Sequence, residues 1–202
     1  WKTQGGHRRI SMPSIREYQR KHNMLTASAD GRDHRLRVLL VDDSRIFRGA
    51  LQSALEELDW VRVAGSVFSG EKALAVLETT PVDLVLLDLE MPGLSGLETL
   101  KLIQRLNGSR PPLEQAGVLI VSSQPNAQTE AVKKAISYGA FGFLAKPVST
   151  IPGVPPKVAL LEGLLPFLER YRNRLERLKI GGTGSRTIPQ PVRDPNTHAT
   201  GL

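Results

Sequence analysis

The chain has 202 residues, a length that allows one domain of ordinary size with tails or two small domains. It lacks cysteine, which excludes disulfides and suits a reducing cytoplasm, and no apolar stretch approaches the ~18 residues of a membrane helix. The net charge of +7 belongs to the two ends, because residues 37–150 hold eleven Lys and Arg against thirteen Asp and Glu.

Residues 1–36 are expected to be a disordered N-terminal tail. They carry eight Lys and Arg against three Asp and Glu and lack sustained hydrophobic periodicity. A basic tail can bind nucleic acid or anionic lipid, but solvated disorder is the favoured interpretation of this composition. We therefore expect no specific nucleic acid and no membrane among the partners. The chain opens with Trp1, which favours a fragment or a processed product, with Met24 as an alternative start.

Five short apolar runs in the following residues predict a parallel β-sheet. Each run is rich in Val and Leu and is bounded by polar or turn residues, as is typical of strands buried on both faces. Helical patterns alternate with the runs, which indicates an α/β sheet with right-handed crossovers. The expected strands are Val38–Val41, Val61–Val67, Asp83–Asp88, Val118–Ser122 and Gly142–Lys146.

Cap residues and apolar spacing predict the helices between these strands. Ser44 can cap the first helix and Ser69 the second. Further helices are expected over Leu97–Leu106 and near Asn126–Tyr138. Residues at 3- and 4-residue spacing should form the buried faces. They are Ile46, Phe47, Ala50, Leu51, Ala54, Leu55 and Leu58 in the first helix, and Ala131, Val132, Ala135 and Ile136 in the fourth.

Charged residues stand at the ends of three of the expected strands. Asp42 and Asp43 follow the first, Asp88 ends the third, and Lys146 ends the fifth. Because the carboxyl ends of parallel strands meet at one edge of a sheet, these side chains should share a crevice. Such a set can hold a hard divalent cation and accept a phosphoryl group. The alternative interpretation is a solvated acidic turn and a surface lysine.

Five places in the sequence, in order and at expected strand ends, match one known pattern. They are Asp42-Asp43, Asp88, Met91-Pro92-Gly93 with Gly96, Ser122 after an apolar run, and Lys146-Pro147. Through them the chain resembles a response-regulator receiver domain of two-component signalling. The resemblance implies a receiver domain over residues 37–150. It also implies a flavodoxin-like, doubly wound, five-stranded parallel sheet of order 2-1-3-4-5.

The resemblance implies that Asp88 is the site of phosphorylation and that Mg2+ is the cofactor. Asp43 and Asp88 would be direct ligands, Asp42 would act through a water molecule, and the backbone carbonyl of Glu90 would complete the protein ligands. Crowding of the three carboxylates is expected to raise the pKa of at least one. Lys146 would stabilise the phosphoryl oxygens and, before phosphorylation, would pair with Asp88.

Ser122 and Phe143 match the switch pair of the same family. The Ser122 hydroxyl would turn toward a phosphoryl oxygen, and Phe143 would fill the space that it leaves. The alternatives are a strand-end serine with local hydrogen bonds and an ordinary core aromatic. The phosphoryl group would come from a sensor histidine kinase.

The C-terminal part divides into two expected segments. Residues 151–180 should form the fifth helix, extended past the domain, with a late start or a kink at Pro166. Residues 181–202, which contain Gly-Gly-Thr-Gly and three prolines, should be a linker or a disordered tail.

Segments 87–92, 121–123 and 139–147 resemble the receiver half of the chemotaxis-type protein-glutamate methylesterases. Their esterase needs an α/β domain of its own, and only about fifty residues follow Val148, so we expect no stand-alone catalytic domain here. A C-terminal output domain would then lie beyond Leu202. A DNA-binding regulator would need a helix-turn-helix domain, for which the C-terminal segment is unsuited. A magnesium-dependent aspartyl phosphatase is a further alternative, but its nucleophile ends the first strand, whereas Asp88 ends the third.

Overall fold

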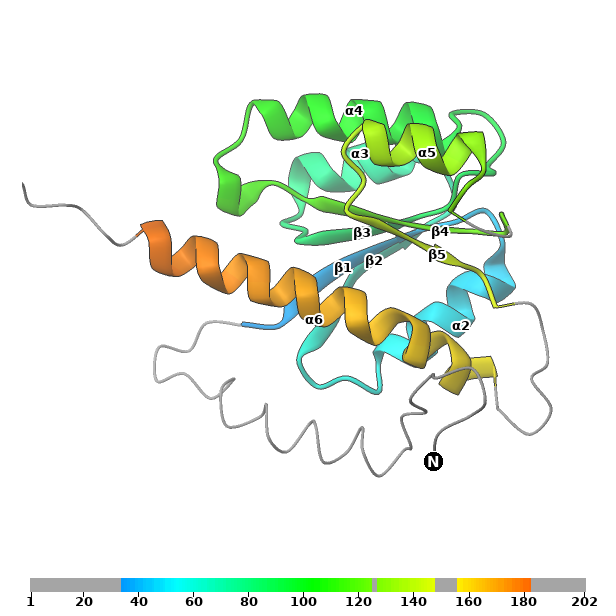
Figure 1. The fold of residues 1–202 in the computed structure, drawn as a ribbon, viewed down its shortest axis with the longest axis horizontal. Helices are drawn as coiled ribbons and strands as arrows, with labels where there is room; N and C mark the ends of the chain where they lie inside the picture. The colour runs from blue at the N-terminus through cyan, green and yellow to red at the C-terminus, as the bar shows by residue number, and fades with distance from the viewer. Residues whose placement is uncertain (1–33, 125–126, 148–155, 183–202) are drawn as a thin grey trace, which may run out of the picture.

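The computed structural model describes residues 34–124, 127–147 and 156–182. Within these residues, five parallel strands form one sheet in the order β2-β1-β3-β4-β5, which confirms the expected order. Figure 1 shows the sheet between two layers of helices. The strands are β1 (Leu36–Val41), β2 (Val61–Val67), β3 (Leu84–Leu87), β4 (Gly117–Ser122) and β5 (Gly142–Ala145).

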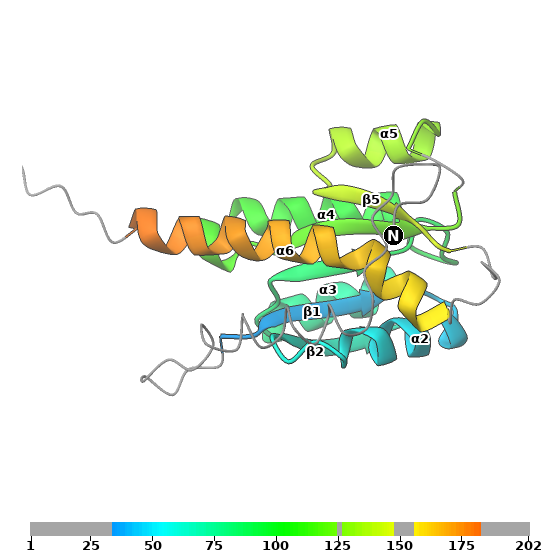
Figure 2. The ribbon, with the colours of Figure 1, turned by 60° about the horizontal axis from the view of Figure 1, so that its bottom comes forward.

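Helices cover both faces of the sheet, as in a doubly wound α/β fold. Helices α3, α4 and α5 lie on one face, and α2 and α6 lie on the other (Figure 1). Figure 2 shows α6 crossing its face of the sheet, with its C-terminal end projecting past the strands. The helices are α2 (Arg45–Leu55), α3 (Gly70–Thr79), α4 (Gly96–Gly108), α5 (Glu130–Ser137) and α6 (Pro156–Gly182), with a short 3-10 helix, η1 (Pro112–Glu114), after α4.

Side-chain caps fix where the helices start. The Ser44 hydroxyl accepts a hydrogen bond from the backbone of Phe47 (3.3 Å), and the Ser69 hydroxyl accepts one from the backbone of Lys72 (3.4 Å). Both predicted caps are therefore confirmed. A third serine, Ser95, forms a reciprocal capping box with Glu98 at the start of α4. These caps set the lengths of the loops that follow β1, β2 and β3.

Two apolar residues that were expected to face the core are exposed instead. Ile46 is 87% exposed, because it lies in the first turn of α2, at the rim of the crevice beyond the end of β1. Ile136 is 45% exposed, because α5 buries a narrower stripe made by Val132 and Ala135. The prediction from 3- and 4-residue spacing therefore made the buried faces of α2 and α5 wider than they are.

The bounds of the last two helices also differ from expectation. Helix α5 begins at Glu130 rather than near Asn126, and α6 begins at Pro156, well before Pro166, so a late start is wrong. A proline inside a helix costs about 3 kcal/mol. Each fully buried leucine contributes about 1.5–3 kcal/mol, so the leucines around Pro166 together outweigh that cost. They are Leu160, Leu161, Leu164, Leu165 and Leu168.

Most of the expected tails, over residues 1–36 and 181–202, lies outside the described residues. Where the structure does reach these segments, β1 begins at Leu36 and α6 continues to Gly182. No helix in the described part of the chain combines the length and hydrophobicity that crossing a bilayer requires.

Candidate functional site

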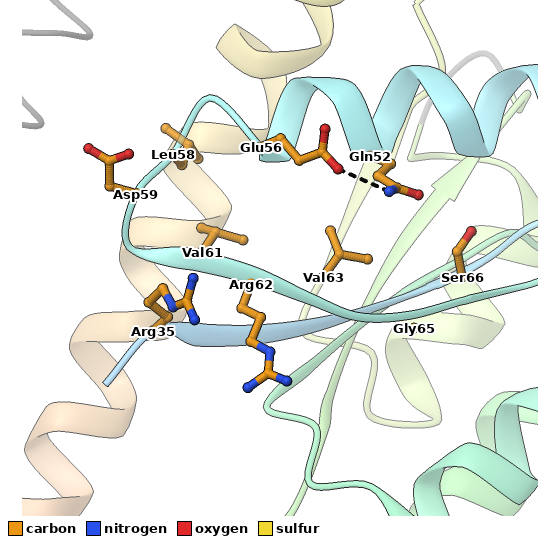
Figure 3. Close-up of a pocket in the computed structure, with 10 residues that line it drawn as sticks. All are labelled: Arg35, Gln52, Glu56, Leu58, Asp59, Val61, Arg62, Val63, Gly65 and Ser66. Atoms are coloured by element: carbon orange, nitrogen blue, oxygen red, sulfur yellow. Dashed lines mark hydrogen bonds between the residues drawn. The ribbon is translucent and has the colours of Figure 1, made fainter. Parts of the chain in front are cut away.

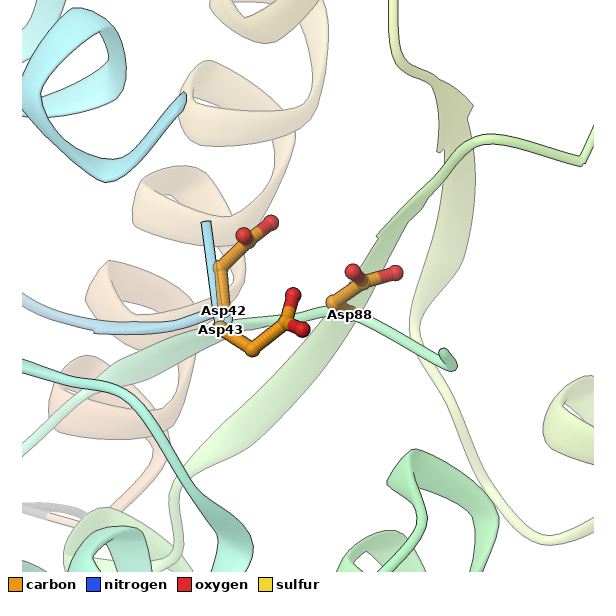
Figure 4. Close-up of side chains that lie close together, drawn as sticks. All are labelled: Asp42, Asp43 and Asp88. Atoms are coloured by element: carbon orange, nitrogen blue, oxygen red, sulfur yellow. The ribbon is translucent and has the colours of Figure 1, made fainter. Parts of the chain in front are cut away.

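Three carboxylates meet at the carboxyl edge of the sheet. Strands β1 and β3 pair directly, and the backbone NH of Asp88 donates to the carbonyl of Val41 (2.9 Å). This pairing brings Asp42 and Asp43, which follow β1, beside Asp88, which follows β3 (Figure 4). One oxygen from each carboxylate lies within 4.8 Å of the others. Asp42 and Asp88 are buried, whereas Asp43 is exposed.

The Lys146 ammonium lies between two of these carboxylates. Its Nζ donates to Oδ2 of Asp88 at 2.6 Å and lies 2.7 Å from Oδ2 of Asp42. The Asp42 contact lacks hydrogen-bond alignment, so this buried oxygen has an ionic contact but no hydrogen bond. The backbone NH of Lys146 donates to the carbonyl of Ser122 (2.8 Å), which fixes where the side chain leaves β5. The expected pairing of Lys146 with Asp88 is therefore present.

Burial and charge compete at this cluster. Burial raises the pKa of Asp88, and the nearby charge of Asp42 adds to the increase, although the hydrogen bond and charge of Lys146 oppose it. For Lys146, burial acts to lower the pKa, but its contacts with the two carboxylates outweigh this effect and raise it. The carboxylate with a raised pKa is thus Asp88, and burial rather than crowding is the main cause. The lysine remains a cation at neutral pH.

The remaining predicted residues lie around this edge. Ser122 is fully buried at the end of β4, and its hydroxyl accepts from the backbone NH of Gln124 (3.4 Å). Phe143, on β5, is half-buried against the core under α3, α4 and α5. The backbone NH of Glu90 donates to Oδ1 of Asp88 (3.3 Å), and its exposed carboxylate accepts from the Gln124 side chain (2.5 Å). The roles of these residues, including a ligand role for the Glu90 carbonyl, stay predictions.

Three contacts at the site were not anticipated from the sequence, and all come from the start of α2. The Phe47 ring lies under the Lys146 ammonium, with 4.7 Å from Nζ to the ring centroid. The Arg48 guanidinium donates to the backbone carbonyl of Asp42 (2.5 Å), and the backbone NH of Ser44 donates to Oδ1 of Asp42 (2.8 Å). The sequence feature that could have indicated these contacts is the position of the three residues at the first helical turn, directly after the acidic pair.

The loop after Asp88 needs glycine at two positions. Gly93 has a φ of 75°, a conformation that side chains disfavour. A Cβ atom at Gly96 would lie 2.0 Å from the carbonyl oxygen of Asp88. Any larger residue at position 96 would therefore displace the backbone of Asp88. This close approach explains why the loop has glycine there.

A hollow of about 500 Å³ between α2 and the edge strand β2 contains none of the predicted site residues (Figure 3). Its lining mixes charges of both signs, with Arg35 and Arg62 against Glu56 and Asp59. Glu56 accepts a hydrogen bond from Gln52 (2.9 Å). No single ligand charge suits this lining, so the carboxylate cluster is the better candidate site.

Two curated relatives that are similar to this chain are both protein-glutamate methylesterases/protein-glutamine glutaminases. A protein-glutamate methylesterase/protein-glutamine glutaminase of Trichodesmium erythraeum is 37% identical over 115 residues, covering 57% of this chain and 31% of the relative. One of Desulfotalea psychrophila is 31% identical over 163 residues, covering 80% of this chain and 42% of the relative. The chain thus spans less than half the length of these relatives.

A solved structure and a family model agree on the fold. The response regulator domain of Thermotoga maritima CheB is 28% identical, with a TM-score of 0.57, over 69% of this chain and 97% of that one. The family model of the response regulator receiver domain matches residues 38–151, more than half of the chain. With the five-stranded order and the acidic cluster, these matches lead to one conclusion: the chain belongs to the response regulator receiver domain family.

Proposed function

We propose that Asp88 accepts a phosphoryl group and that its phosphorylation switches an output surface. The observation that supports this most strongly is the contact of the buried Asp88 carboxylate with the partly buried Lys146 ammonium at the sheet edge. An Asp88 oxygen would attack the donor phosphorus in line, and the bond from phosphorus to the donor would break, leaving an acyl phosphate on Asp88. Lys146 would then pair with an oxygen of the phosphoryl group in place of the carboxylate.

The residues present fit a magnesium ion. Asp42, Asp43 and Asp88 offer hard oxygen ligands within 4.8 Å of one another, and Oδ2 of Asp42 is buried with an ionic contact to Lys146 but no hydrogen bond. These carboxylates, with the backbone carbonyl of Glu90, would hold the ion. When bound, Mg2+ neutralises charge on the phosphoryl oxygens. The exposed side of the cluster, at Asp43, leaves room for the donor to approach.

Ser122 and Phe143 would couple the site to the rest of the domain. Ser122 ends β4, and β4 pairs with β5, which carries Phe143. A hydroxyl that bonds only the phosphorylated state provides the differential affinity that a two-state switch needs. The surface formed by α5 and the first half of α6 would then report the phosphorylation.

The partners follow from the same proposal. The phosphoryl donor would be a sensor histidine kinase, and the chain would act in the cytoplasm. The curated relatives support the proposal that this chain is the N-terminal regulatory part of a chemotaxis methylesterase, whose esterase domain would be the missing output domain. The chain itself would then turn over no substrate beyond its own acyl phosphate.

A turnover measurement separates this function from that of an aspartyl phosphatase. The chain would be incubated with Mg2+ and either acetyl phosphate or p-nitrophenyl phosphate. We expect a burst of one phosphoryl group per chain from acetyl phosphate and no sustained hydrolysis of the phosphomonoester. Steady turnover of p-nitrophenyl phosphate that is lost in Asp88→Asn would favour the phosphatase instead.

A further inference from the structure

A groove lined by arginines lies on the exposed side of α6. It has a volume of about 440 Å³, and its lining includes Arg170, Arg174, Arg177 and Asn173 from α6, with Phe141 from the residue before β5. Since β5 runs from this end toward Lys146, the groove lies at the opposite edge of the sheet from the carboxylate cluster. It is called the arginine groove below.

The three arginines share one helix face and have no acidic partner among the residues that the structure describes. Their spacing of four and three residues places them in one row, and all three are exposed. Arg170 stacks over the Phe141 ring at 4.5 Å and makes a long, 3.4 Å hydrogen bond to that residue's carbonyl. Arg174 and Arg177 make no hydrogen bond or ion pair with any residue that the structure describes. By contrast, Arg172, on another face of α6, pairs with Glu176.

The groove continues into a smaller hollow that adds neutral polar groups. This second hollow, of about 70 Å³, shares Phe141 and Arg174 with the first and is also lined by Gln104 and Gln115. Glu169 is the acidic residue in the lining of the first hollow. The first hollow therefore has three guanidinium groups against one carboxylate, the second adds amide side chains, and the net charge of the lining is positive.

We propose that the arginine groove binds an extended acidic peptide segment of a partner protein. Arginine forks pair with carboxylates through two parallel hydrogen bonds, which favours carboxylates over diffuse negative charge. A helix repeats one face about every 5–6 Å, and an extended peptide repeats one face about every 6.6 Å. Successive arginines of the row can therefore meet alternate carboxylates of the peptide. The lining of the second hollow contains no acidic side chain that would repel the peptide.

Charge also decides against the two ends of this chain as occupants of the groove. Residues 1–33 carry seven Lys and Arg against three Asp and Glu, and residues 183–202 carry two against one, so both ends of the chain are repelled by the row. Nucleic acid is a polyanion as well, so the binding comparison below separates it from an acidic peptide. Phe141 and Pro166 are the apolar residues of the lining, and Arg170 covers the Phe141 ring.

The test uses the whole chain and a fluorescein-labelled hexaglutamate peptide, with binding followed by fluorescence anisotropy. We expect saturable binding that weakens with salt, and a loss of about tenfold or more in affinity when Arg174→Glu and Arg177→Glu are combined. Arg105→Glu, an equal charge change per site on the exposed face of α4 and outside both hollows, should alter affinity less than about twofold. Replacing Arg174 and Arg177 by lysine should weaken binding by an intermediate factor, because the charge stays and the fork is lost.

Two results would overturn the proposal. An effect of Arg105→Glu as large as that of the groove variants would mean diffuse attraction rather than a site. Tighter binding of duplex DNA or of phosphatidylserine vesicles than of hexaglutamate, with the same dependence on Arg174 and Arg177, would assign the groove to nucleic acid or membrane. Circular dichroism of each variant, compared with the parent chain, checks that the exposed substitutions leave α6 folded.

Discussion

The ammonium of Lys146 is shared between two buried carboxylates, and this sharing dominates the energetics of the site. Asp42 and Asp88 are 2% and 3% exposed, so neither carboxylate can rely on water for its solvation. Removing one member of a buried ion pair leaves the other charge uncompensated, which typically costs about 3–5 kcal/mol. The cluster therefore stabilises the domain only while Lys146 is present or a cation takes its place.

Lys146→Met should destabilise the metal-free chain by about 3 kcal/mol near neutral pH. The pKa of Asp88 is raised in the folded state, so the protonated carboxyl favours folding. The ionised carboxylate lowers the free energy of unfolding, and this loss appears as the pH rises toward the folded pKa. Loss of Lys146 raises the pKa of Asp88 further and enlarges the loss of stability at neutral pH. The difference in free energy of unfolding between the parent chain and Lys146→Met should therefore shrink as the solution is acidified. Urea unfolding of parent and variant in chelator, at neutral and acidic pH, measures the free energy of unfolding.

Lys72→Met is the matched control for this comparison. Lys72 also lies over a phenylalanine ring, that of Phe68 at 5.2 Å, but it is exposed. Its loss should cost less than about 1 kcal/mol and should show little pH dependence. An equal cost for the two variants, or a deficit at Lys146 that does not change with pH, would contradict the description of the cluster.

At the scale of the elements, sequence signals located the serine-capped starts of α2 and α3 better than the starts of α5 and α6 or the burial of helix faces. Ser44 and Ser69 were identifiable as caps because a hydroxyl before an apolar run satisfies free backbone NH groups locally. The exposure of Ile46 was not predictable, because it depends on where α2 begins relative to the sheet edge. The course of α6 through Pro166 depends likewise on leucine packing against β-strands distant in sequence.

Strand β4 provides the test of coupling between the site and the helices. Ser122→Ala should leave Asp88 able to accept phosphate while removing the bond that distinguishes the phosphorylated state. Amide chemical shifts over residues 127–143, recorded with and without beryllofluoride, would report the coupling. We expect the shift changes of the parent chain to be largely lost in Ser122→Ala.

Ser123→Ala is the control, since this neighbouring serine is exposed rather than buried. It should retain the shift changes of the parent chain. If Ser122→Ala responds to beryllofluoride as the parent does, the switch role assigned to Ser122 is wrong.

At the scale of the whole molecule, strand order brings the site together. Asp42 and Asp88 become neighbours because β1 lies next to β3, and Lys146 reaches them from β5, across β4, at the same edge. The meeting of these charged residues at the carboxyl edge was predictable from the sequence. Each follows or ends a buried apolar run, and the carboxyl ends of parallel strands lie at the same edge of a sheet. The contact of Phe47 with Lys146 and the arginine groove were not, because both depend on how helices from different parts of the chain settle on the sheet.

The central claim is that Asp88 is the phosphoacceptor, and intact-mass spectrometry after incubation with acetyl phosphate and Mg2+ tests it most directly. The parent chain should gain the mass of one phosphoryl group, and it should lose the gain when a chelator replaces Mg2+. Asp88→Asn, which keeps the size of the side chain but removes the nucleophilic carboxylate, should gain nothing. Undiminished labelling of Asp88→Asn would contradict the account.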